Sequence, residues 1–391
     1  MKNETTAPSP IDRMIDFLTT HYAFRYNTVM NCTEYRPVDS PVGSFEPLDL
    51  RTRRRIILEV QREGMEVSQN DIRNYIDSDY VRQYDPVGDY LAECEGVWDG
   101  HDHIGDLART VPTDTPLWRE WFTTWLLAMV SQWQNQSSRL YGNSVAPLLI
   151  SPQGYNKSTF CRRLLPDALK WGYTDSLALS DRRQVMLAMS QQLLINLDEF
   201  NQISPRVQQG FLKNIIQLPS VKVKRPFGTH IEELPRKASF IATSNMTDIL
   251  ADPSGNRRFI GIELTAPIDT SRVPDHRQLF AQALQLLRNG RRSWFDKAET
   301  EQIMLWNRRY EIQEPADQYF SLCFSVANDP LDPSAEWLST AEIFDVIKQK
   351  VGSSLKANTL IAFGRKLANM PDMRRRKCET CTRYLVKRVG Q

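Results

Sequence analysis

A lysine and a serine follow a tight loop at residues 151–158, and their types and spacing suit phosphate binding. The segment 146–160 runs from apolar residues into this loop and then into a predicted helix. Backbone N–H groups of such a loop bind nucleotide phosphates, a lysine reaches the β- and γ-phosphates, and a hydroxyl group holds Mg²⁺. Lys157 and Ser158 would take those two roles. The other residues that we expect to contact the nucleotide are Gln153, Gly154, Tyr155, Asn156 and Thr159.

The loop meets the signature G-x-x-x-x-G-K-[ST] only in part. Ser151 stands in place of the first glycine and Asn156 in place of the second, which leaves Gly154 inside the loop. Asparagine adopts positive φ more readily than most residues, so Asn156 can take the loop geometry at some cost. An ordinary polar turn between a strand and a helix is the alternative.

Two adjacent carboxylates, Asp198 and Glu199, end the next apolar stretch at residues 192–197. One carboxylate can hold Mg²⁺ through water, and the other can orient or deprotonate an attacking water. We assign Asp198 to the metal and Glu199 to the water. Solvated carboxylates at a strand end are the alternative.

A third apolar strand ends in three polar residues, Thr243, Ser244 and Asn245. The Asn245 amide could position the water or sense the γ-phosphate. Arg257 and Arg258, slightly further on, are candidates for a charge clamp supplied to a neighbouring subunit's nucleotide, with a solvated surface as the alternative. We expect all of these groups at the carboxyl ends of strands, because open α/β sheets bind ligands at that edge.

The elements that must position these residues follow from hydrophobic periodicity. Residues 1–10 are predicted to be a disordered tail and residues 11–140 a helical domain, whose helix at 118–133 would support the sheet. Residues 145–265 alternate strand and helix, which predicts a parallel sheet. This sheet lies in a domain predicted over 141–320, in which 274–292 form a helical lid. Residues 330–391 have the order helix, helix, β-hairpin, the outline of a winged helix.

The order of the four motifs resembles the virulence-associated protein E family of P-loop ATPases, over roughly residues 70–320. The match rests on 153–159, Asp198-Glu199, 243–245 and the Asn-Arg-Arg-Phe element that ends at Phe259. That family is related to poxvirus-type primase-helicases and superfamily 3 helicases, which have an AAA+ core. The resemblance implies an α/β, AAA+-like P-loop core, ATP and Mg²⁺ as cofactors, and assembly into a hexamer-type ring.

A basic segment at 221–233 is predicted to be a hairpin just before the third strand. In the resembled helicases a hairpin at this point enters the central channel and tracks one DNA strand. Its basic side chains could contact the DNA backbone and Phe227 could stack on a base, whereas an edge hairpin protected by lysines is the alternative. The candidate DNA contacts are Lys222, Lys224, Arg225 and His230.

A second basic segment runs from Arg365 to the C-terminus, with nine Lys or Arg residues against two acidic ones, a net charge of +7. Such a balance predicts contacts with duplex phosphates, and a solvated basic tail is the alternative. Cys378 and Cys381 lack a second ligand pair nearby, so we expect a hairpin turn with free thiols. The candidate contacts are Arg365, Lys366, Arg374, Arg375, Arg376 and Lys377.

The composition is that of a globular protein with 41% hydrophobic and 25% charged residues. No apolar run is long enough to span a bilayer, and the six cysteines are scattered, so we expect reduced thiols, no membrane contact and a cytoplasmic location. The family resemblance implies that the cell is a bacterial or phage-infected bacterial cell. The net charge of +2 does not by itself predict nucleic-acid binding, so that prediction rests on the charge of individual segments.

These observations favour a homo-oligomeric, ATP-dependent DNA helicase or translocase of a phage or mobile element, acting on single-stranded or duplex DNA. We do not expect primer synthesis, because no polymerase carboxylate set precedes the loop. The alternative is a non-catalytic protein that binds nucleotide through a degenerate P-loop and acts through DNA binding or interference with replication. Ser151 and Asn156 favour that alternative, whereas Asp198-Glu199 and the intact Asn-Arg-Arg-Phe element favour a working ATPase.

Overall fold

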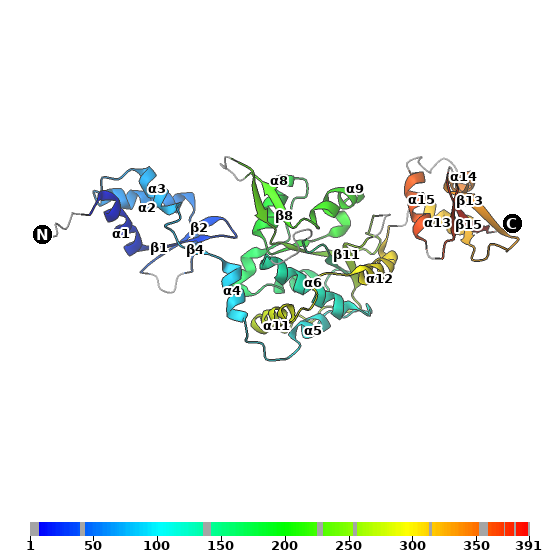
Figure 1. Cartoon of the computed structure of the whole chain (residues 1–391), viewed down its shortest axis with the longest axis horizontal. Coiled ribbons are helices and arrows are strands. Elements are labelled where there is room, and N and C mark those ends of the chain that lie inside the picture. Colours follow the sequence, from blue (N-terminus) through cyan, green and yellow to red (C-terminus); the bar gives the residue numbers. More distant parts are fainter. Residues whose placement is uncertain are drawn as a thin grey trace.

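The computed structural model describes residues 8–39, 44–135, 142–224, 230–252, 256–312, 315–351, 359–370, 372–378 and 381–389. Figure 1 shows three units in a row, which we call the N-terminal unit (residues 9–84), the central unit (86–312) and the C-terminal unit (315–389). Of the predicted tail, residues 1–7 lie outside the described residues. Ser9 is already structured, because it caps the first helix in a capping box with Asp12.

The N-terminal unit combines helices with a small sheet. The helices α1 (Pro10–His21), α2 (Leu50–Arg62) and α3 (Gln69–Ile76) enclose a core around Leu18, Ile56 and Ile72. Strands β1 (Tyr22–Asn27), β2 (Cys32–Pro37), β3 (Glu46–Pro47) and β4 (Gln83–Tyr84) form a sheet in the order β3-β2-β1-β4.

The prediction of a helical domain over 11–140 therefore missed the sheet of the N-terminal unit. Residues 22–37 are rich in tyrosine and threonine, which favour strands, and Asn31 takes a φ of 53° in the turn between β1 and β2. The paired strands share the unit's core with the helices, so tertiary packing outweighs the helical spacing around them.

The central unit is built on a five-stranded sheet in the order β11-β5-β10-β7-β6. All four neighbouring pairs are parallel, as the alternation of strand and helix predicts. The strands are β5 (Ala146–Ile150), β6 (Tyr173–Thr174), β7 (Leu194–Leu197), β10 (Ser239–Ser244) and β11 (Phe259–Glu263).

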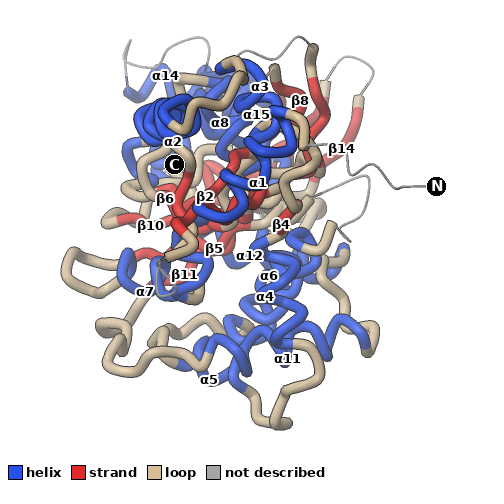
Figure 2. The backbone as a smooth tube through the Cα atoms, turned by 90° about the vertical axis from the view of Figure 1, so that its left-hand side faces the viewer, coloured by secondary structure: helices blue, strands red, loops and turns tan. Residues whose placement is uncertain are grey.

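Helices cover both faces of this sheet, which lies between them in Figures 1 and 2. Side chains of β5 alternate between the two cores, since Leu149 faces one and Leu148 the other. The first face carries α4 (Pro86–Cys94), α5 (His103–Arg109), α6 (Trp118–Trp133), α7 (Lys157–Arg163) and α11 (His276–Arg288). The second carries α8 (Arg182–Gln191), α9 (Pro205–Val207), α10 (Lys213–Ile215) and the hairpin of β8 (Ser220–Val223) and β9 (Glu232–Pro235).

Short helical turns and one further helix complete the central unit. They are η1 (Asp167–Gly172), η2 (Phe200–Gln202), the π-turn η3 (Gln208–Leu212), α12 (Lys297–Asn307) and η4 (Arg308–Tyr310). The side chain of Asn307 is fully buried and donates to the carbonyl oxygens of Asn256 and Phe259, so α12 holds the start of strand β11.

Helix α6 has the bounds predicted from the sequence and supports the sheet as expected. Trp125 is fully buried and donates through Nε1 to the carbonyl of Phe240 on β10, over 3.2 Å. Burial of the Phe122 and Leu126 side chains of the same helix contributes about 1.5–3 kcal/mol each. Because α4, α5 and α6 share one core with the sheet, the structure groups residues 86–133 with the central unit rather than with the N-terminal helices.

The C-terminal unit has its own core, which includes Phe320, Phe344 and Phe363. Ser339 caps the first of the two predicted helices by accepting from the backbone N–H of Glu342 over 3.2 Å. Two strands, β12 and β13, add to the predicted hairpin. The elements are α13 (Pro315–Cys323), β12 (Phe324–Val326), β13 (Ala335–Ser339), α14 (Thr340–Val351), α15 (Thr359–Asn369), β14 (Arg375–Lys377) and β15 (Thr382–Arg388).

The turn between β1 and β2 connects the N-terminal and central units. Val29 in this turn is buried within the core that α6 and the sheet share. The carbonyl of Met30 accepts from the side chain of Gln191 at the end of α8, over 3.2 Å. Among the described residues no helix is long and apolar enough to span a membrane.

Candidate functional site

The predicted phosphate loop, residues 151–158, connects the buried strand β5 to helix α7 and has the backbone that a tight loop needs. Gly154 has a φ of 83° and Asn156 a φ of 61°, so the expected left-handed conformation of Asn156 is confirmed. The Asn156 side chain also donates to the carbonyl of Ile268 over 3.1 Å, and the N–H of Ile268 donates to the carbonyl of Tyr155 at the same distance. The loop is therefore held by the segment that follows β11.

The ammonium group of Lys157 lies inside this loop, and the residue is 7% exposed. Its Nζ donates to the carbonyl and hydroxyl oxygens of Ser151 at 2.8 Å each, and to the carbonyl of Pro152 at 3.0 Å. A fourth acceptor is the side-chain oxygen of Asn245, also at 3.0 Å. Burial lowers the pKa of Lys157, and the nearby charge of Asp198 opposes that shift.

Ser151 replaces a glycine of the signature and has a role that sequence reasoning missed. Its hydroxyl accepts from Lys157 and donates to the carbonyl of Pro152 over 3.0 Å. The only sign of this role in the sequence is that a serine replaces the first glycine of the signature. The contact itself follows from the loop's curvature, which places residues 151 and 157 against each other.

Two carboxylates follow strand β7 and differ in their partners. The Asp198 Oδ1 atom accepts from the hydroxyl of Ser158, with 3.4 Å between the oxygens, and from the hydroxyl of Thr243 at the end of β10. Glu199 has a φ of 49°, a costly conformation for a residue other than glycine, and its carboxylate accepts from the side chain of Gln202.

The oxygens around Asp198 form a donor set that suits Mg²⁺. This ion prefers carboxylate and hydroxyl oxygens and usually keeps several waters, so it needs few protein ligands. Ser158 and Asp198, as predicted, and Thr243 in addition, could hold the ion directly or through water. Within the described part of the chain no cluster of three or more His, Cys, Asp or Glu side chains offers another metal site.

A cavity of about 300 Å³ joins these groups at the carboxyl edge of the sheet. It brings together the predicted phosphate, metal and water residues from three separate segments of the chain. Its lining comprises Gln153, Gly154, Tyr155, Asn156, Lys157, Ser158, Thr159, Asp198, Glu199, Thr243, Ser244 and Asn245. A cation, two carboxylates and an amide thus face one small space, which is the arrangement needed to position a triphosphate and a water.

The two arginines lie elsewhere, and one part of the prediction is wrong. Both precede β11, whose Phe259 pairs with Ala146 at the start of β5, so they lie at the amino edge of the sheet. We expected every group of the site to follow a strand, and this is wrong for the two arginines. They come directly before strand β11, not after a strand. A strand of five residues spans about 17 Å, so this chain's own phosphate loop lies at the opposite edge.

Burial also separates the two arginines from each other. Arg257 is exposed, whereas Arg258 is 9% exposed and donates to the side chain of Gln217 over 2.8 Å. Burial, followed by the charge of Arg257, lowers the pKa of Arg258. Arg258 is therefore part of the packing below β11, and only Arg257 presents its charge at the surface.

Comparison with known proteins identifies the family. The sequence profile of the virulence-associated protein E-like domain matches residues 91–312, more than half of the chain. The chain belongs to this family. The matched region contains the phosphate loop, both carboxylates, Asn245 and both arginines. No curated protein shows significant sequence similarity to the chain.

Solved structures resemble this virulence-associated protein E-like chain in fold. An apo structure of the NrS-1 C-terminal region matches with a TM-score of 0.50 and 12% identity, covering 98% of this chain and 100% of that one. Two further structures of that region match with TM-scores of 0.48 and 0.46, each at 11% identity, with 98% and 97% of this chain covered and all of the other chain in both cases.

The basic segment before β10 forms the predicted hairpin in this family member. Strands β8 and β9 are antiparallel, with Lys222 opposite Glu233 and an Nζ-to-carboxylate distance of 4.0 Å. Lys222, Lys224 and His230 are exposed. Arg225 and Phe227, at the predicted tip, lie outside the described residues.

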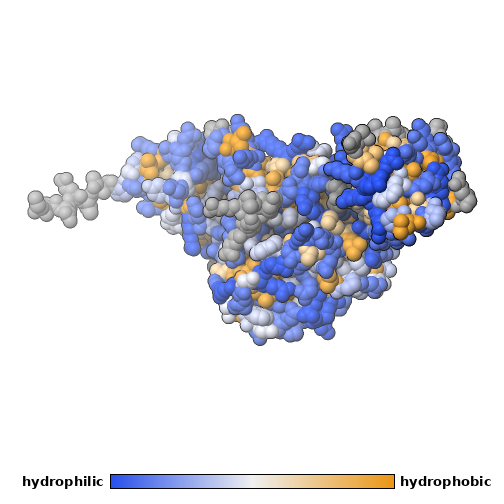
Figure 3. All heavy atoms as spheres, turned by 45° about the vertical axis from the view of Figure 1, so that its right-hand side comes forward, coloured by the Kyte–Doolittle hydropathy of each residue, from blue (hydrophilic) through white to orange (hydrophobic). Residues whose placement is uncertain are grey.

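The C-terminal basic residues are mostly exposed, and hydrophilic side chains dominate this unit on the side drawn in Figure 3. Strand β14 carries Arg375, Arg376 and Lys377 on the edge of β15, and the Arg376 guanidinium lies 5.5 Å from the centre of the Trp337 ring. Lys366 differs from the prediction, because its Nζ donates to the carbonyl of Ile312 over 2.7 Å and thereby joins the C-terminal and central units. Arg365 and Arg374 are exposed as well.

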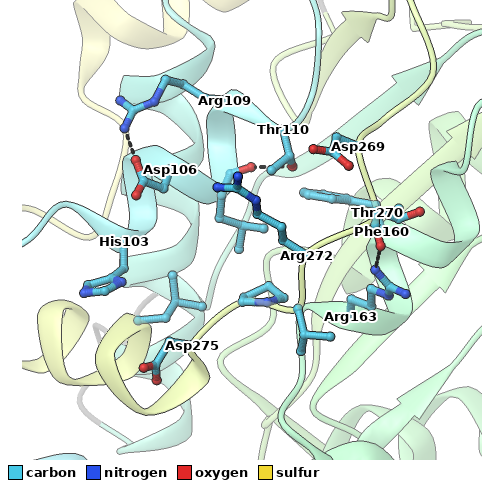
Figure 4. Close-up of a pocket in the computed structure, with 14 residues that line it drawn as sticks. His103, Asp106, Arg109, Thr110, Phe160, Arg163, Asp269, Thr270, Arg272 and Asp275 are labelled. Carbon is cyan, nitrogen blue, oxygen red and sulfur yellow. Dashed lines mark hydrogen bonds and ion pairs between the residues drawn. The ribbon is translucent and has the colours of Figure 1, made fainter.

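A second cavity, of about 440 Å³, lies beside the phosphate loop; we call it the lateral cavity. It lies between α5, α7, the segment 269–275 and the start of α11 (Figure 4). Residues 157–159 at the start of α7 line the first cavity, and Phe160 and Arg163 line the second. Sequence reasoning missed this cavity, because its walls come from segments about 170 residues apart.

Proposed function

We propose that this protein is an ATP-driven DNA translocase or helicase with a P-loop site at the carboxyl edge of the central sheet. The observation that carries the proposal is the convergence of Lys157, Asp198, Glu199 and Asn245 on one cavity of about 300 Å³. Membership of the virulence-associated protein E-like family supports a role in the replication of a phage or mobile element. The similarity to the NrS-1 region supports the fold alone.

Each residue has a role that follows from its position. The backbone N–H groups of the loop and the Lys157 ammonium bind the triphosphate, because Lys157 Nζ can exchange its loop acceptors for phosphate oxygens. Ser158 and Asp198 hold Mg²⁺, which when bound neutralises charge that develops on the β- and γ-phosphate oxygens. Glu199 accepts a proton from the attacking water, and the Asn245 amide orients that water.

The same proposal includes an AAA+-like assembly. Arg257 is exposed at the sheet edge opposite its own loop, so it would act on the nucleotide of a neighbouring subunit in a hexamer-type ring. The β8–β9 hairpin would contact a single DNA strand through Lys222 and Lys224. The C-terminal unit would act as a winged-helix domain, with Arg374 to Lys377 on duplex phosphates.

A second candidate function has one observation in its favour. Ser151 supplies Lys157 with two of its four acceptors, so phosphate must compete with these oxygens for the ammonium. A protein whose P-loop lysine is held by its own loop in this way could bind nucleotide without hydrolysing it. It could then act as a DNA-binding or replication-interfering protein.

ATP hydrolysis by the full chain, measured with and without single-stranded DNA, tests the proposal. We expect hydrolysis that DNA stimulates and that Lys157→Ala abolishes. Lys170→Ala is the matched control, because Lys170 is an exposed lysine paired with Asp167 outside the cavity. Glu199→Gln should bind ATP without hydrolysing it. Binding with no turnover in the wild type would favour the second candidate, and equal turnover in Lys157→Ala would refute the site.

A further inference from the structure

The lateral cavity has an apolar floor and a polar rim. Leu107 of α5, Phe160 of α7 and Leu279 of α11 form the floor, and their exposed fractions are 7%, 3% and 0%. In Figure 4, Arg272 extends from the segment 269–275 toward α5, and Thr110 and Asp269 lie beside it. Small-molecule sites combine apolar surface with polar groups that fix the orientation of the ligand, and 440 Å³ is within their usual range.

The rim is tied to the phosphate loop through consecutive residues. Ile268 exchanges hydrogen bonds with Tyr155 and Asn156 of the loop, and the next residue, Asp269, donates its N–H to the carbonyl of Thr110 over 3.2 Å. Arg163 of α7 donates to the carbonyl of Thr270. The two cavities therefore share α7 as a wall, and residues 268–270 link the rim of the lateral cavity to the loop. Phe160 follows Lys157 by only about 4.5 Å along the helix axis.

One carboxylate at the rim, that of Asp269, has an oxygen that can accept a further hydrogen bond. The Oδ1 atom of Asp269 accepts from the N–H of Ser271 at 2.9 Å and from its hydroxyl at 2.6 Å, whereas no described residue donates to Oδ2. These hydrogen bonds lower the pKa of Asp269, so the carboxylate is ionised at neutral pH. An ionised oxygen beside an apolar floor suits a flat ring that carries hydrogen-bond donors on its edge.

We propose that the lateral cavity binds the base of the nucleotide, and that Asp269 Oδ2 accepts a hydrogen bond from an exocyclic amino group of that base. This inference rests on the proposed function, because the phosphates of the same molecule would lie on the loop. The base would pack on Phe160, Leu107 and Leu279, and the nucleotide would pass around the first turn of α7. Arg272 and Thr110 would flank the base at the opening.

The cavity can be blocked from its rim without disturbing the core. Val273 lines the cavity and is 71% exposed, so Val273→Trp should fill the opening and still fold. The matched control is Val389→Trp, at an exposed valine of the C-terminal unit. Two probes separate base from phosphate: ATP needs both cavities, and inorganic tripolyphosphate needs only the loop.

For the full-length protein with Mg²⁺, we expect Val273→Trp to weaken ATP binding about tenfold or more and to leave tripolyphosphate binding unchanged, while Val389→Trp changes neither. Unchanged ATP affinity, or an equal loss for both probes, would overturn the base assignment and leave the phosphate site intact. Wild-type protein that binds neither probe would overturn the proposed function as well.

A second variant tests the amino contact. ITP has a carbonyl oxygen in place of the amino group of ATP, so wild-type protein should prefer ATP by about tenfold. Asp269→Asn keeps Oδ1 for Ser271 and replaces the free oxygen by a donor, so it should remove most of that preference. A preference that survives in Asp269→Asn would refute the role of Asp269.

Discussion

The Nζ atom of Lys157 lies 3.0 Å from the side-chain oxygen of Asn245, and this contact joins the phosphate loop to the end of strand β10. The residues are 88 positions apart and adjoin strands that are neighbours in the sheet. The group that we propose to bind phosphate is thus in direct contact with the group that we propose to sense it. If phosphate draws Lys157 forward, the Asn245 amide becomes free to bind water.

Asn245→Ala tests this contact. The substitution removes one acceptor of Lys157 and the amide that would orient water, so we expect kcat for ATP hydrolysis to fall about 10²–10³-fold with a smaller change in ATP affinity. Asn289→Ala, at an exposed asparagine after α11, is the control. Unchanged kcat in Asn245→Ala would place water orientation on another residue.

Arg257 and Arg258 should respond differently to alanine. Arg257→Ala should reduce hydrolysis by about 10³–10⁵-fold with the fold intact, because the residue is exposed and would act on a neighbour's nucleotide. Arg258→Ala should instead lower the free energy of unfolding by about 1–3 kcal/mol, because it removes a buried side chain and its partly buried hydrogen bond to Gln217. Denaturation curves and turnover rates separate the two effects.

Mixing two inactive variants checks whether Arg257 acts between subunits. Arg257→Ala combined with Glu199→Gln should regain some hydrolysis, since a mixed ring contains interfaces at which each partner supplies its intact half. A protein that stays monomeric with ATP and DNA, without rescue on mixing, would contradict the ring.

The exposed charges on β14 should set the salt dependence of DNA binding. Arg375→Ala with Lys377→Ala should lower the slope of log K against log salt by about 0.9 for each duplex phosphate that these two side chains neutralise. The control removes two exposed arginines from the N-terminal unit, as Arg54→Ala with Arg62→Ala. Equal slopes for the two double variants would show that β14 makes no specific interaction with the phosphates.

Gly261 on β11 packs directly against Tyr310, and a side chain there has no space. A Cβ atom at residue 261 would lie 2.2 Å from Cδ2 of Tyr310, which is itself fully buried. Gly261→Ala should therefore lower the free energy of unfolding by about 1–3 kcal/mol in urea denaturation. Gly210→Ala meets no atom within 4 Å and should have no cost; a similar destabilisation in both variants would contradict this packing account.

The sequence alone determined those features that depend on neighbouring residues. Local spacing predicted the bounds of helix α6 and the alternation of parallel strands with helices over residues 146–263. The backbone preference of asparagine predicted the left-handed conformation of Asn156. The residues that line the cavity of about 300 Å³ could be named for the same reason. Each follows a buried strand, and parallel strands bring their carboxyl ends to one edge.

Only the tertiary structure decided what depends on distant segments. Strand pairing turned residues 22–37 into a sheet, and the direction of β11 put Arg257 at the edge opposite Lys157. The lateral cavity also arises from packing, because segments distant in sequence become neighbours only when the cores form. Hydrophobic spacing shows which face of an element is buried, but it does not show which element covers that face.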